Sequence, residues 1–591
     1  MLKENKICQN CNNEFIIEPD DFQFYEKIKV PPPTWCPECR MIRRLNFRNE
    51  RSLYRRKCDL CSSGTMSMYR SDANFLVYCN KCWFSDKWDA SSFGKEYNSK
   101  EPFFKQFYEL LLSVPRLALE GYQNENVQFS NYTWLSKNAY LSPSTLSSEN
   151  ILYSHTVWNT TDSADCLQVY FGQLCYEVIN SYRCVNVKYI TDSKECLDSL
   201  FLLDCRNCSN CFMSSNLRSK SYVFRNKQLT TKQYKEELDK IDFGNFRVVE
   251  ELKNEYNSMR LKAIRRFANF VNTFGSTGNN LTNAKNCFHC FNGEKLENVR
   301  YGAQMTTIKD SADLYGAGNG AELLYEGVNV GYKSSSDIFS TATYDETRNN
   351  KYCNYCIGSS YLFGSVCMKK KQYCILNKQY TKEEYEELVL KIIDHMNDMP
   401  YVDKKGRIYT YGEFFPPELS PFCYNETIAQ EYFPLTKEQA LDQGYNWKEP
   451  EQRNYKIDIK SQDLPDHIKD ASDNIVGKVI ECVHHGECNE QCTTAFKIIK
   501  EELQFYKKMN LPLPRLCPNC RHYQRLKQRN PLELWHRKCT CSGEKSDNGV
   551  YQNTIKHFHE AEHCPNEFET SYAPDRPEIV YCEQCYQAEV V

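Results

Sequence analysis

Short apolar and aromatic runs, separated by Asn, Asp, Ser and Gly, fill residues 125–229 and 275–380. Neither stretch shows the 3.6-residue periodicity of an amphipathic helix. Cysteines recur within them at intervals of about 9–12 residues, for example at Cys166, Cys175 and Cys184. Such spacing is typical of short strands joined by turns. We therefore predict a β-solenoid, in which each coil buries its face by stacking on the next. A sandwich of irregular strands is the alternative.

The two stretches match each other, which indicates an internal duplication. The text "DSAD" begins at Asp162 and returns at Asp310. Each stretch is followed by a charged pattern of helical period, "TKQYKEELDKI" after the first and "TKEEYEELVLKIIDHM" after the second. One further helix is expected from Thr436 to Gln443. The inner cysteines of the solenoid are expected to form a buried ladder, since a free thiol behaves as a small hydrophobe.

Cys-x-x-Cys pairs follow one another in sets of two near the ends of the chain. The middle also holds such pairs, at Cys287/Cys290 and Cys353/Cys356, where metal binding is the alternative to the buried ladder. The chain has 32 cysteines and begins "MLKENKICQN", without the apolar core of an export signal. In a reducing compartment this spacing indicates metal binding rather than disulfides. Two such turns aim four thiolates at one point, the tetrahedral pattern of structural zinc. We expect a cytoplasmic protein, and two zinc sets near the start: Cys8, Cys11, Cys36 and Cys39, then Cys58, Cys61, Cys79 and Cys82.

The last part of the chain repeats this arrangement. "CPECRMIRRLNFRN", which starts at Cys36, returns as "CPNCRHYQRLKQRN" from Cys517. The first ligand of the second copy is less well defined: Cys488 is one residue early, and Cys482, His484 and His485 lie nearby. About four structural zinc ions are expected in all. The predicted ligands of the second copy are Cys488, Cys492, Cys517, Cys520, Cys539, Cys564, Cys582 and Cys585.

A zinc knuckle, a "QFY" helix, a Pro-containing loop and "CPxCR" follow one another at both ends. This order resembles a zinc-binding domain family of the treble-clef, zinc-ribbon-like type found in many bacterial proteins. The resemblance covers roughly residues 5–48 and 482–530. It implies zinc binding and a helix that begins at the second knuckle, and it implies no reaction.

Arginines follow each "CPxC" turn at a helical spacing of four residues, so they share one helix face. Such a stripe could track the phosphates of a nucleic acid. The alternative is that the arginines pair with carboxylates of the neighbouring repeat or stay solvated. The formal charge of −3 adds no global basic field to the nucleic-acid hypothesis. The tentative nucleic-acid residues are Arg40, Arg44, Arg48, Arg521, Arg525 and Arg529.

Enzyme motifs are scarce: the chain has no Gly-x4-Gly-Lys-Ser/Thr or Gly-x-Ser-x-Gly pattern. Paired carboxylates of a solenoid can cleave carbohydrates, and Asp162, Asp165, Asp310 and Asp313 are the candidates here. The alternative is that these residues form turns. The segment "HFHEAEHC" could hold a three-His metal site with an open position. It could also assist the Cys539/Cys564 site or be an ordinary polar loop; its histidines are His557, His559 and His563.

The predicted fold is mainly β with α: a duplicated β-solenoid-like core flanked by two double-zinc modules. The favoured function is a zinc-binding scaffold that contacts an unknown protein partner without catalysis. Nucleic-acid binding and a carbohydrate-active enzyme are the alternatives, and no membrane partner is expected. The predicted segments are 1–90 (double-zinc module), 91–124 (helical connector), 125–229 (first solenoid block), 230–274 (helical insert), 275–380 (second block), 381–480 (helical segment and linker) and 481–591 (double-zinc module).

Overall fold

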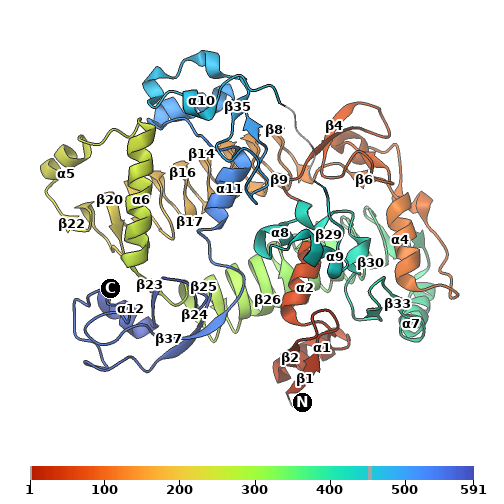
Figure 1. Cartoon of the computed structure of the whole chain (residues 1–591). Helices are drawn as coiled ribbons and strands as arrows, with labels where there is room; N and C mark the ends of the chain where they lie inside the picture. Colours follow the sequence, from red (N-terminus) through yellow and green to blue (C-terminus); the bar gives the residue numbers. More distant parts are fainter. Residues whose placement is uncertain (1–2, 450–454) are drawn as a thin grey trace.

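Two runs of β-solenoid form the centre of the computed structural model, which describes residues 3–449 and 455–591 (Figure 1). The first run is a rod with two parallel sheets along its length, and the predicted solenoid is confirmed. One sheet contains β8 (Glu125–Gln128), β10 (Lys137–Tyr140), β12 (Glu149–Leu152), β14 (Thr161–Ala164), β16 (Gln173–Tyr176), β18 (Val185–Lys188), β19 (Leu197–Leu203), β20 (Ser209–Ser215), β21 (Ser221–Phe224) and β22 (Lys227–Gln228). The other contains β7 (Gly121–Tyr122), β9 (Thr133–Trp134), β11 (Thr145–Leu146), β13 (His155–Trp158), β15 (Leu167–Tyr170) and β17 (Ile179–Tyr182).

Each coil of the first solenoid is 12 residues long, since Lys137 pairs in register with Glu149. A residue with positive φ stands at every third position, which turns the chain through a corner. Asn and Asp tolerate this left-handed conformation better than most residues. Their side chains also form a ladder from coil to coil: Asn138 Nδ2 donates to Asn150 Oδ1 at 3.0 Å, and Asn150 Nδ2 to Asp162 Oδ1 at 2.8 Å. The corners therefore explain why this part of the sequence is rich in Asn and Asp.

The inside of the coils carries a ladder of hydroxyl and thiol groups. Ser142 Oγ donates to the carbonyl of Tyr140 at 2.9 Å, and the Ser142 N–H donates to Ser130 Oγ at 2.8 Å, one coil earlier. Cys175 takes an equivalent place: its thiol lies 3.5 Å from the carbonyl of Cys184, and its N–H donates to Ser163 Oγ. The solenoid cysteines are buried in this ladder, as predicted.

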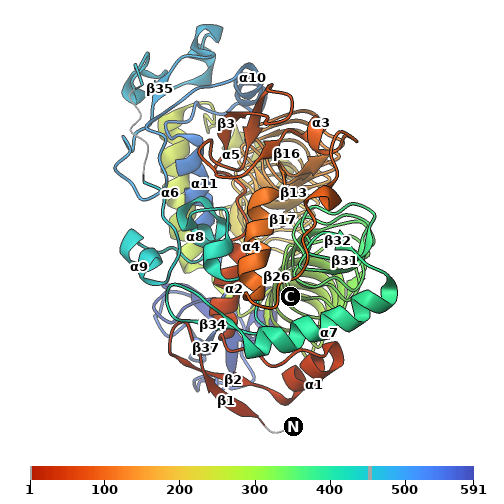
Figure 2. The same ribbon diagram turned by 90° about the vertical axis from the view of Figure 1, so that its right-hand side faces the viewer.

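The second solenoid repeats the design with coils of 11 to 13 residues. Capping boxes at Thr230 and Thr381 begin the helices that follow the two solenoids. These helices are α5 (Thr231–Leu238) and α6 (Phe246–Lys262) after the first, and α7 (Lys382–Asp398) after the second, which runs along its end beside β31 (Figure 2). The strands are β24 (Phe270–Phe274), β25 (Gly278–Lys285), β26 (Phe288–Tyr315), β27 (Ala321–Glu322), β28 (Tyr325–Val330), β29 (Ile338–Thr343), β30 (Ser360–Phe363), β31 (Gln372–Ile375) and β32 (Lys378–Gln379).

Each end of the chain forms two small lobes, and every lobe is a β-hairpin with a helix after it. In the N-terminal module the lobes contain β1 (Glu4–Ile7), β2 (Glu14–Ile17), α1 (Pro19–Ile28) and α2 (Pro37–Leu45), then β3 (Tyr54–Lys57), β4 (Gly64–Ser67) and α3 (Asn80–Trp83). In the C-terminal module they contain β35 (Ile480–Glu481), β36 (Ala495–Phe496), α10 (Lys500–Met509) and α11 (Pro518–Leu526), then β37 (Trp535–Lys538), β38 (Glu567–Thr570) and α12 (Glu583–Val590). The duplication of the ends is therefore also structural.

The two modules cross over the two solenoids. The second N-terminal lobe caps the start of the first solenoid, where β5 (Val77–Tyr78) pairs in parallel with β6 (Arg116–Leu117). The second C-terminal lobe caps the start of the second solenoid through β39 (Ile579–Tyr581) and β23 (Ile264–Arg266). The first lobes do the opposite: α2 packs on β26 and β28 of the second solenoid, and α11 lies along the first (Figure 1).

The segment between the second solenoid and the C-terminal module joins these parts. It contains β33 (Tyr401–Val402), which lies beside α4 (Phe103–Ser113), and β34 (Ile408–Tyr409), then α8 (Ile428–Tyr432) and α9 (Lys437–Asp442). The expected helix at Thr436 is α9, with Thr436 as its N-cap. Across the described ranges, no helix combines the length and apolar character needed to span a bilayer.

Candidate metal centres

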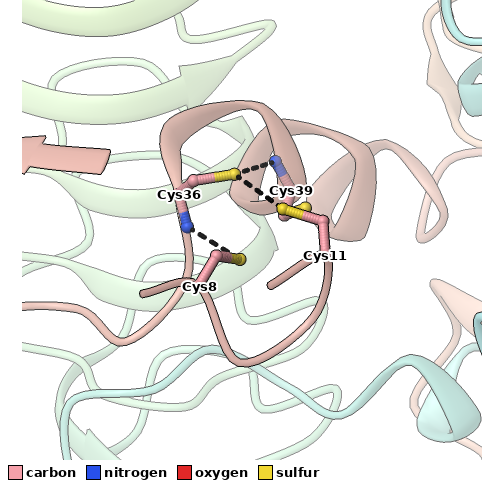
Figure 3. Close-up of side chains that lie close together, drawn as sticks. All are labelled: Cys8, Cys11, Cys36 and Cys39. Carbon is pink, nitrogen blue, oxygen red and sulfur yellow. Dashed lines mark hydrogen bonds between the residues drawn. The ribbon is translucent and has the colours of Figure 1, made fainter. Parts of the chain in front are cut away.

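The first cysteine set comes together at the junction of a hairpin and a helix. Cys8 directly follows β1, and Cys36 is the N-cap of α2. The Cys36 N–H donates to Cys8 Sγ at 3.2 Å, and the Cys39 N–H lies 3.5 Å from Cys36 Sγ (Figure 3). Cys11 Sγ lies 3.8 Å from Cys36 Sγ. Tetrahedral zinc with Zn–S bonds of about 2.3 Å would separate its sulfurs by about 3.8 Å. The set is therefore preformed for one metal ion.

The same geometry recurs in all four lobes. In each, the backbone N–H of the third cysteine, at the start of a helix, donates to the first thiol at 3.2 Å. The four ligand atoms of every set lie within 4.8 Å of one another. All 32 cysteines are free thiols, which leaves them available to a metal. The sets are Cys8, Cys11, Cys36 and Cys39; Cys58, Cys61, Cys79 and Cys82; Cys482, Cys492, Cys517 and Cys520; and Cys539, Cys564, Cys582 and Cys585.

The third set contains Cys482 in the place for which Cys488 was predicted. Cys482 directly follows β35, as Cys8 follows β1, and its sulfur accepts the Cys517 N–H. Cys488 Sγ lies at the edge of the set, 3.7 Å from Cys520 Sγ. The position after the first strand of the hairpin, rather than the spacing to Cys492, identifies the residue equivalent to Cys8.

The other two alternatives for this position turn away. The ring of His484 faces Glu490 at 3.2 Å, and the ring of His485 faces Glu481 at 3.5 Å. Both histidines are thus engaged with carboxylates outside the thiol cluster.

The thiol clusters favour the ionised form of individual cysteines. Hydrogen bonds from Cys36 and Cys39 hold the pKa of Cys8 far below its usual range. Hydrogen bonds from Cys482 and Cys520 do the same for the pKa of Cys517. The thiolate is the form that binds metal. Each helix N-terminus also places a partial positive charge beside these sulfurs.

The arginines after the "CPxC" turns are buried and do not form a surface for phosphates. Arg40 Nη2 and Arg44 Nη1 each lie 2.9 Å from a carboxylate oxygen of Asp313. Arg48 forms an ion pair with Glu50. The stripe therefore holds the N-terminal module to the second solenoid. For Arg40 and Arg44 the alternative, pairing with carboxylates of the repeat, is the arrangement present, and nucleic-acid binding by this stripe stays a prediction.

The second arginine stripe has the matching arrangement on the other solenoid. Arg521 Nη1 donates to Asp165 Oδ2 at 2.8 Å, and Arg525 Nη1 to Asp165 Oδ1 at 2.6 Å. Arg529 stacks over the ring of Tyr432, 4.1 Å from its centroid. All three arginines are at most 8% exposed.

The candidate carboxylates of a solenoid enzyme are structural in this arrangement. Asp165 and Asp313 are fully buried and neutralised by the arginines. Asp162 and Asp310 stand on the outer corner ladder, where they accept from Asn150 and Asn298. Asp162 and Asp165 stand at successive positive-φ positions of one coil, and so do Asp310 and Asp313. Within each pair, one carboxylate is buried and the other lies on the outer ladder.

The N-terminal and C-terminal cysteine modules also touch each other. Arg51 Nη2 donates to Asn519 Oδ1 at 3.0 Å. Glu431, from α8, lies 3.7 Å from Arg51 and 3.2 Å from the ring of His522. The modules, the linker and both solenoids therefore form one connected body of contacts.

The three histidines of the segment "HFHEAEHC" do not share one set of partners. His557 and His559 point to Cys541 and Cys585, whereas His563 pairs with Asp547 at 2.9 Å. A three-His site with an open position is not formed. Sequence reasoning missed Cys541 because it has no equivalent in the N-terminal module.

Comparisons with known proteins add little to this picture. No protein-family model matches the chain, and no curated protein matches its sequence. One solved structure, described as a "putative acetyltransferase" from Desulfovibrio desulfuricans G20, aligns with 7% identity over 49% of this chain and 86% of its own, with a TM-score of 0.10. A TM-score this low carries no argument about fold or activity.

Proposed function

We propose that this chain is a zinc-dependent scaffold: four zinc ions hold two solenoids in a fixed arrangement, and the solenoid surfaces bind a protein partner without catalysis. The observation that carries the proposal is the crossing of the modules. Each four-cysteine set sits at the start of a helix, and α2 and α11 carry the arginines that reach the opposite solenoid. Zinc binding would therefore determine whether the arginines are presented at all.

The energy of zinc binding is large enough for this role. A structural zinc contributes on the order of 10 kcal/mol to the folding of a small lobe. The lobes themselves are short hairpins and helices of four to ten residues. Such lobes bury little apolar surface of their own, so loss of the metal is expected to unfold them. Zinc fits four thiolates in a closed tetrahedron, a structural rather than a catalytic arrangement.

A protein partner is the proposed ligand because solenoids present extended surfaces that commonly bind proteins. The stripes that motivated the nucleic-acid alternative are buried in ion pairs. Free thiols throughout the chain also support the proposal of a reducing, cytoplasmic location.

The experiment that tests the proposal removes the metal from the full chain with a high-affinity chelator. X-ray scattering should report an expanded particle, and limited proteolysis should cut first within residues 5–49 and 482–530, while the solenoid core persists. Added zinc should restore the compact state. An unchanged scattering curve and cleavage pattern after complete metal removal would refute the scaffold role of zinc.

A further inference from the structure

The C-terminal module contains an insertion that its N-terminal copy lacks. Two residues separate Cys58 from Cys61, whereas 24 separate Cys539 from Cys564. The insertion carries a further group of potential ligands beside the fourth four-cysteine set. The ligand atoms of Cys541, His557, His559 and Cys585 lie within 4.8 Å of one another. Cys585 belongs to both groups.

The distances within this group suit one small metal ion. Cys541 Sγ lies 3.2 Å from His557 Nδ1, and His559 Nε2 lies 3.3 Å from Cys585 Sγ. Zinc with bonds of about 2.3 Å to sulfur and about 2.0 Å to nitrogen would place such pairs about 3.5 Å apart. Cys541 and Cys585 are fully buried, and His557 is 4% exposed. His559 is partly buried, so three of the four side chains lie in the interior and the fourth lies at its edge.

Each histidine has its other ring nitrogen bonded in the manner of a metal ligand. His557 Nε2 lies 2.9 Å from Glu589 Oε1, and His559 Nδ1 lies 2.6 Å from the carbonyl oxygen of Glu562. When these nitrogens carry the protons, His557 Nδ1 and His559 Nε2 face the sulfurs as lone pairs. A carboxylate or carbonyl behind the ring is the usual outer partner of a zinc-bound histidine.

The outer partners are themselves held in place. Glu589 accepts from the backbone N–H of Thr554 and from the hydroxyl of Tyr551, at 2.9 and 3.0 Å. Asn553 Nδ2 donates to Cys541 Sγ at 3.2 Å, and its side-chain carbonyl accepts from Tyr581 at 2.8 Å. This network fixes the directions of the cysteine and the histidine ring before any ion arrives.

We propose that the C-terminal module binds a further divalent metal ion, zinc, through Cys541 Sγ, His557 Nδ1, His559 Nε2 and Cys585 Sγ, so that Cys585 bridges two ions. The charge of the cluster favours two metal ions over one. Five thiolates with one Zn²⁺ would carry a formal charge of about −3 in a buried place, and the second ion reduces it to about −1. Four protein ligands leave no open position, so this ion is structural.

The inference rests on the proposed function, because the second ion bridged by Cys585 is the zinc proposed to bind Cys539, Cys564 and Cys582. Metal counting separates the two claims. If the four all-cysteine sites fail, the full chain binds fewer than four ions. If only this inference fails, it binds four.

The first experiment measures zinc per chain by elemental analysis and native mass spectrometry of the full-length protein. Five ions are expected for the wild type and four for Cys541→Ser or His559→Gln. His563→Gln is the matched control, because His563 lies in the same segment but pairs with Asp547; it should keep five. Four ions in the wild type and in every variant would overturn the proposal.

The second experiment uses the wild type alone, so it does not depend on whether a variant folds. The protein is loaded with ¹¹³Cd and examined by NMR. One resonance should show two sulfur and two nitrogen donors, and it should be scalar-coupled to an all-sulfur resonance through Cys585. Only uncoupled all-sulfur resonances would refute the shared thiolate.

Discussion

Arg525 Nη1 donates to Asp165 Oδ1 at 2.6 Å, although 360 residues separate them in the chain. Asp165 comes from the first "DSAD" motif, and Asp313, from the second, meets Arg40 and Arg44 in the same way. One duplicated contact thus joins the N-terminal cysteine module to the second solenoid and the C-terminal module to the first.

Replacement of Asp165 by Asn should destabilise the protein by about 3–5 kcal/mol, because it leaves the buried Arg525 without its counter-charge and Arg521 with Glu502 alone. Asp162→Asn is the control. Asp162 accepts from Asn150 on the outer ladder, where Asn stands at the equivalent corners, so its loss should cost less than about 0.5 kcal/mol. Denaturant unfolding of both variants checks the difference. Equal stabilities of the two variants would contradict the structural role of Asp165.

Arg44→Lys separates a structural role of the stripe from phosphate binding. Arg44 Nη1 lies 2.9 Å from Asp313 and 3.0 Å from Glu326, and the shorter side chain of lysine does not bring its ammonium to that position. We expect a loss of about 2 kcal/mol or more in the free energy of unfolding. Thermal and denaturant unfolding measure it.

The control for this variant is Arg55→Lys, at an exposed position of β3, which should change stability by less than about 0.5 kcal/mol. Binding to single- and double-stranded RNA and DNA across a salt series completes the test. If Arg44→Lys keeps full stability, the ion pairs do not hold the module, and a salt-dependent affinity would then favour phosphate binding.

The cysteines of the solenoid and of the lobes should respond differently to serine. Cys175→Ser should leave the metal content unchanged and cost at most about 1 kcal/mol, since Ser163 fills the equivalent ladder position one coil earlier. Cys517→Ser should remove about one zinc per chain and destabilise the C-terminal module by several kcal/mol. Elemental analysis with thermal unfolding tests both. A metal loss in Cys175→Ser would show that the ladder also binds metal.

Glu120 should make the stability of the protein fall as the pH rises. Burial raises the pKa of Glu120 to about 7, although Tyr344 and Asn329 donate hydrogen bonds to its carboxylate. A raised carboxyl pKa means that the folded state holds the proton more tightly than the unfolded state. The contribution of Glu120 to the free energy of unfolding is complete below about pH 4.5 and is lost as the pH rises to about 7.

Glu120→Gln removes this titration. The stability of the variant relative to the wild type should therefore increase by about 2–3 kcal/mol between about pH 5 and pH 8. Denaturant unfolding at fixed zinc across this range measures the difference and cancels the pH dependence of the metal sites. Parallel stability curves for the two proteins would show that Glu120 does not titrate as described.

The local units were predictable because each depends on a few neighbouring residues. Cys36 with Cys39 and Cys517 with Cys520 each stand at the start of a helix after a Pro-containing loop, so these pairs could be identified from a few neighbouring residues. The recurrence of Asn, Asp, Ser and Cys predicted the solenoid because every coil needs the same corner and the same inner wall. The helix caps at Thr230 and Thr381 follow from the same local rules.

The sequence by itself determined the duplicated four-cysteine lobes, the duplicated solenoid and the correspondence of each lobe with its copy. Only the tertiary structure decided that α2 reaches the second solenoid and α11 the first, because ion pairs across hundreds of residues depend on how the coils stack rather than on any local pattern. The same holds for Cys482 in place of Cys488 and for the meeting of Cys541 with His557, His559 and Cys585. An insertion changes the number of residues between cysteines, so a spacing motif no longer identifies the ligands. The folded hairpin still brings the same thiols together.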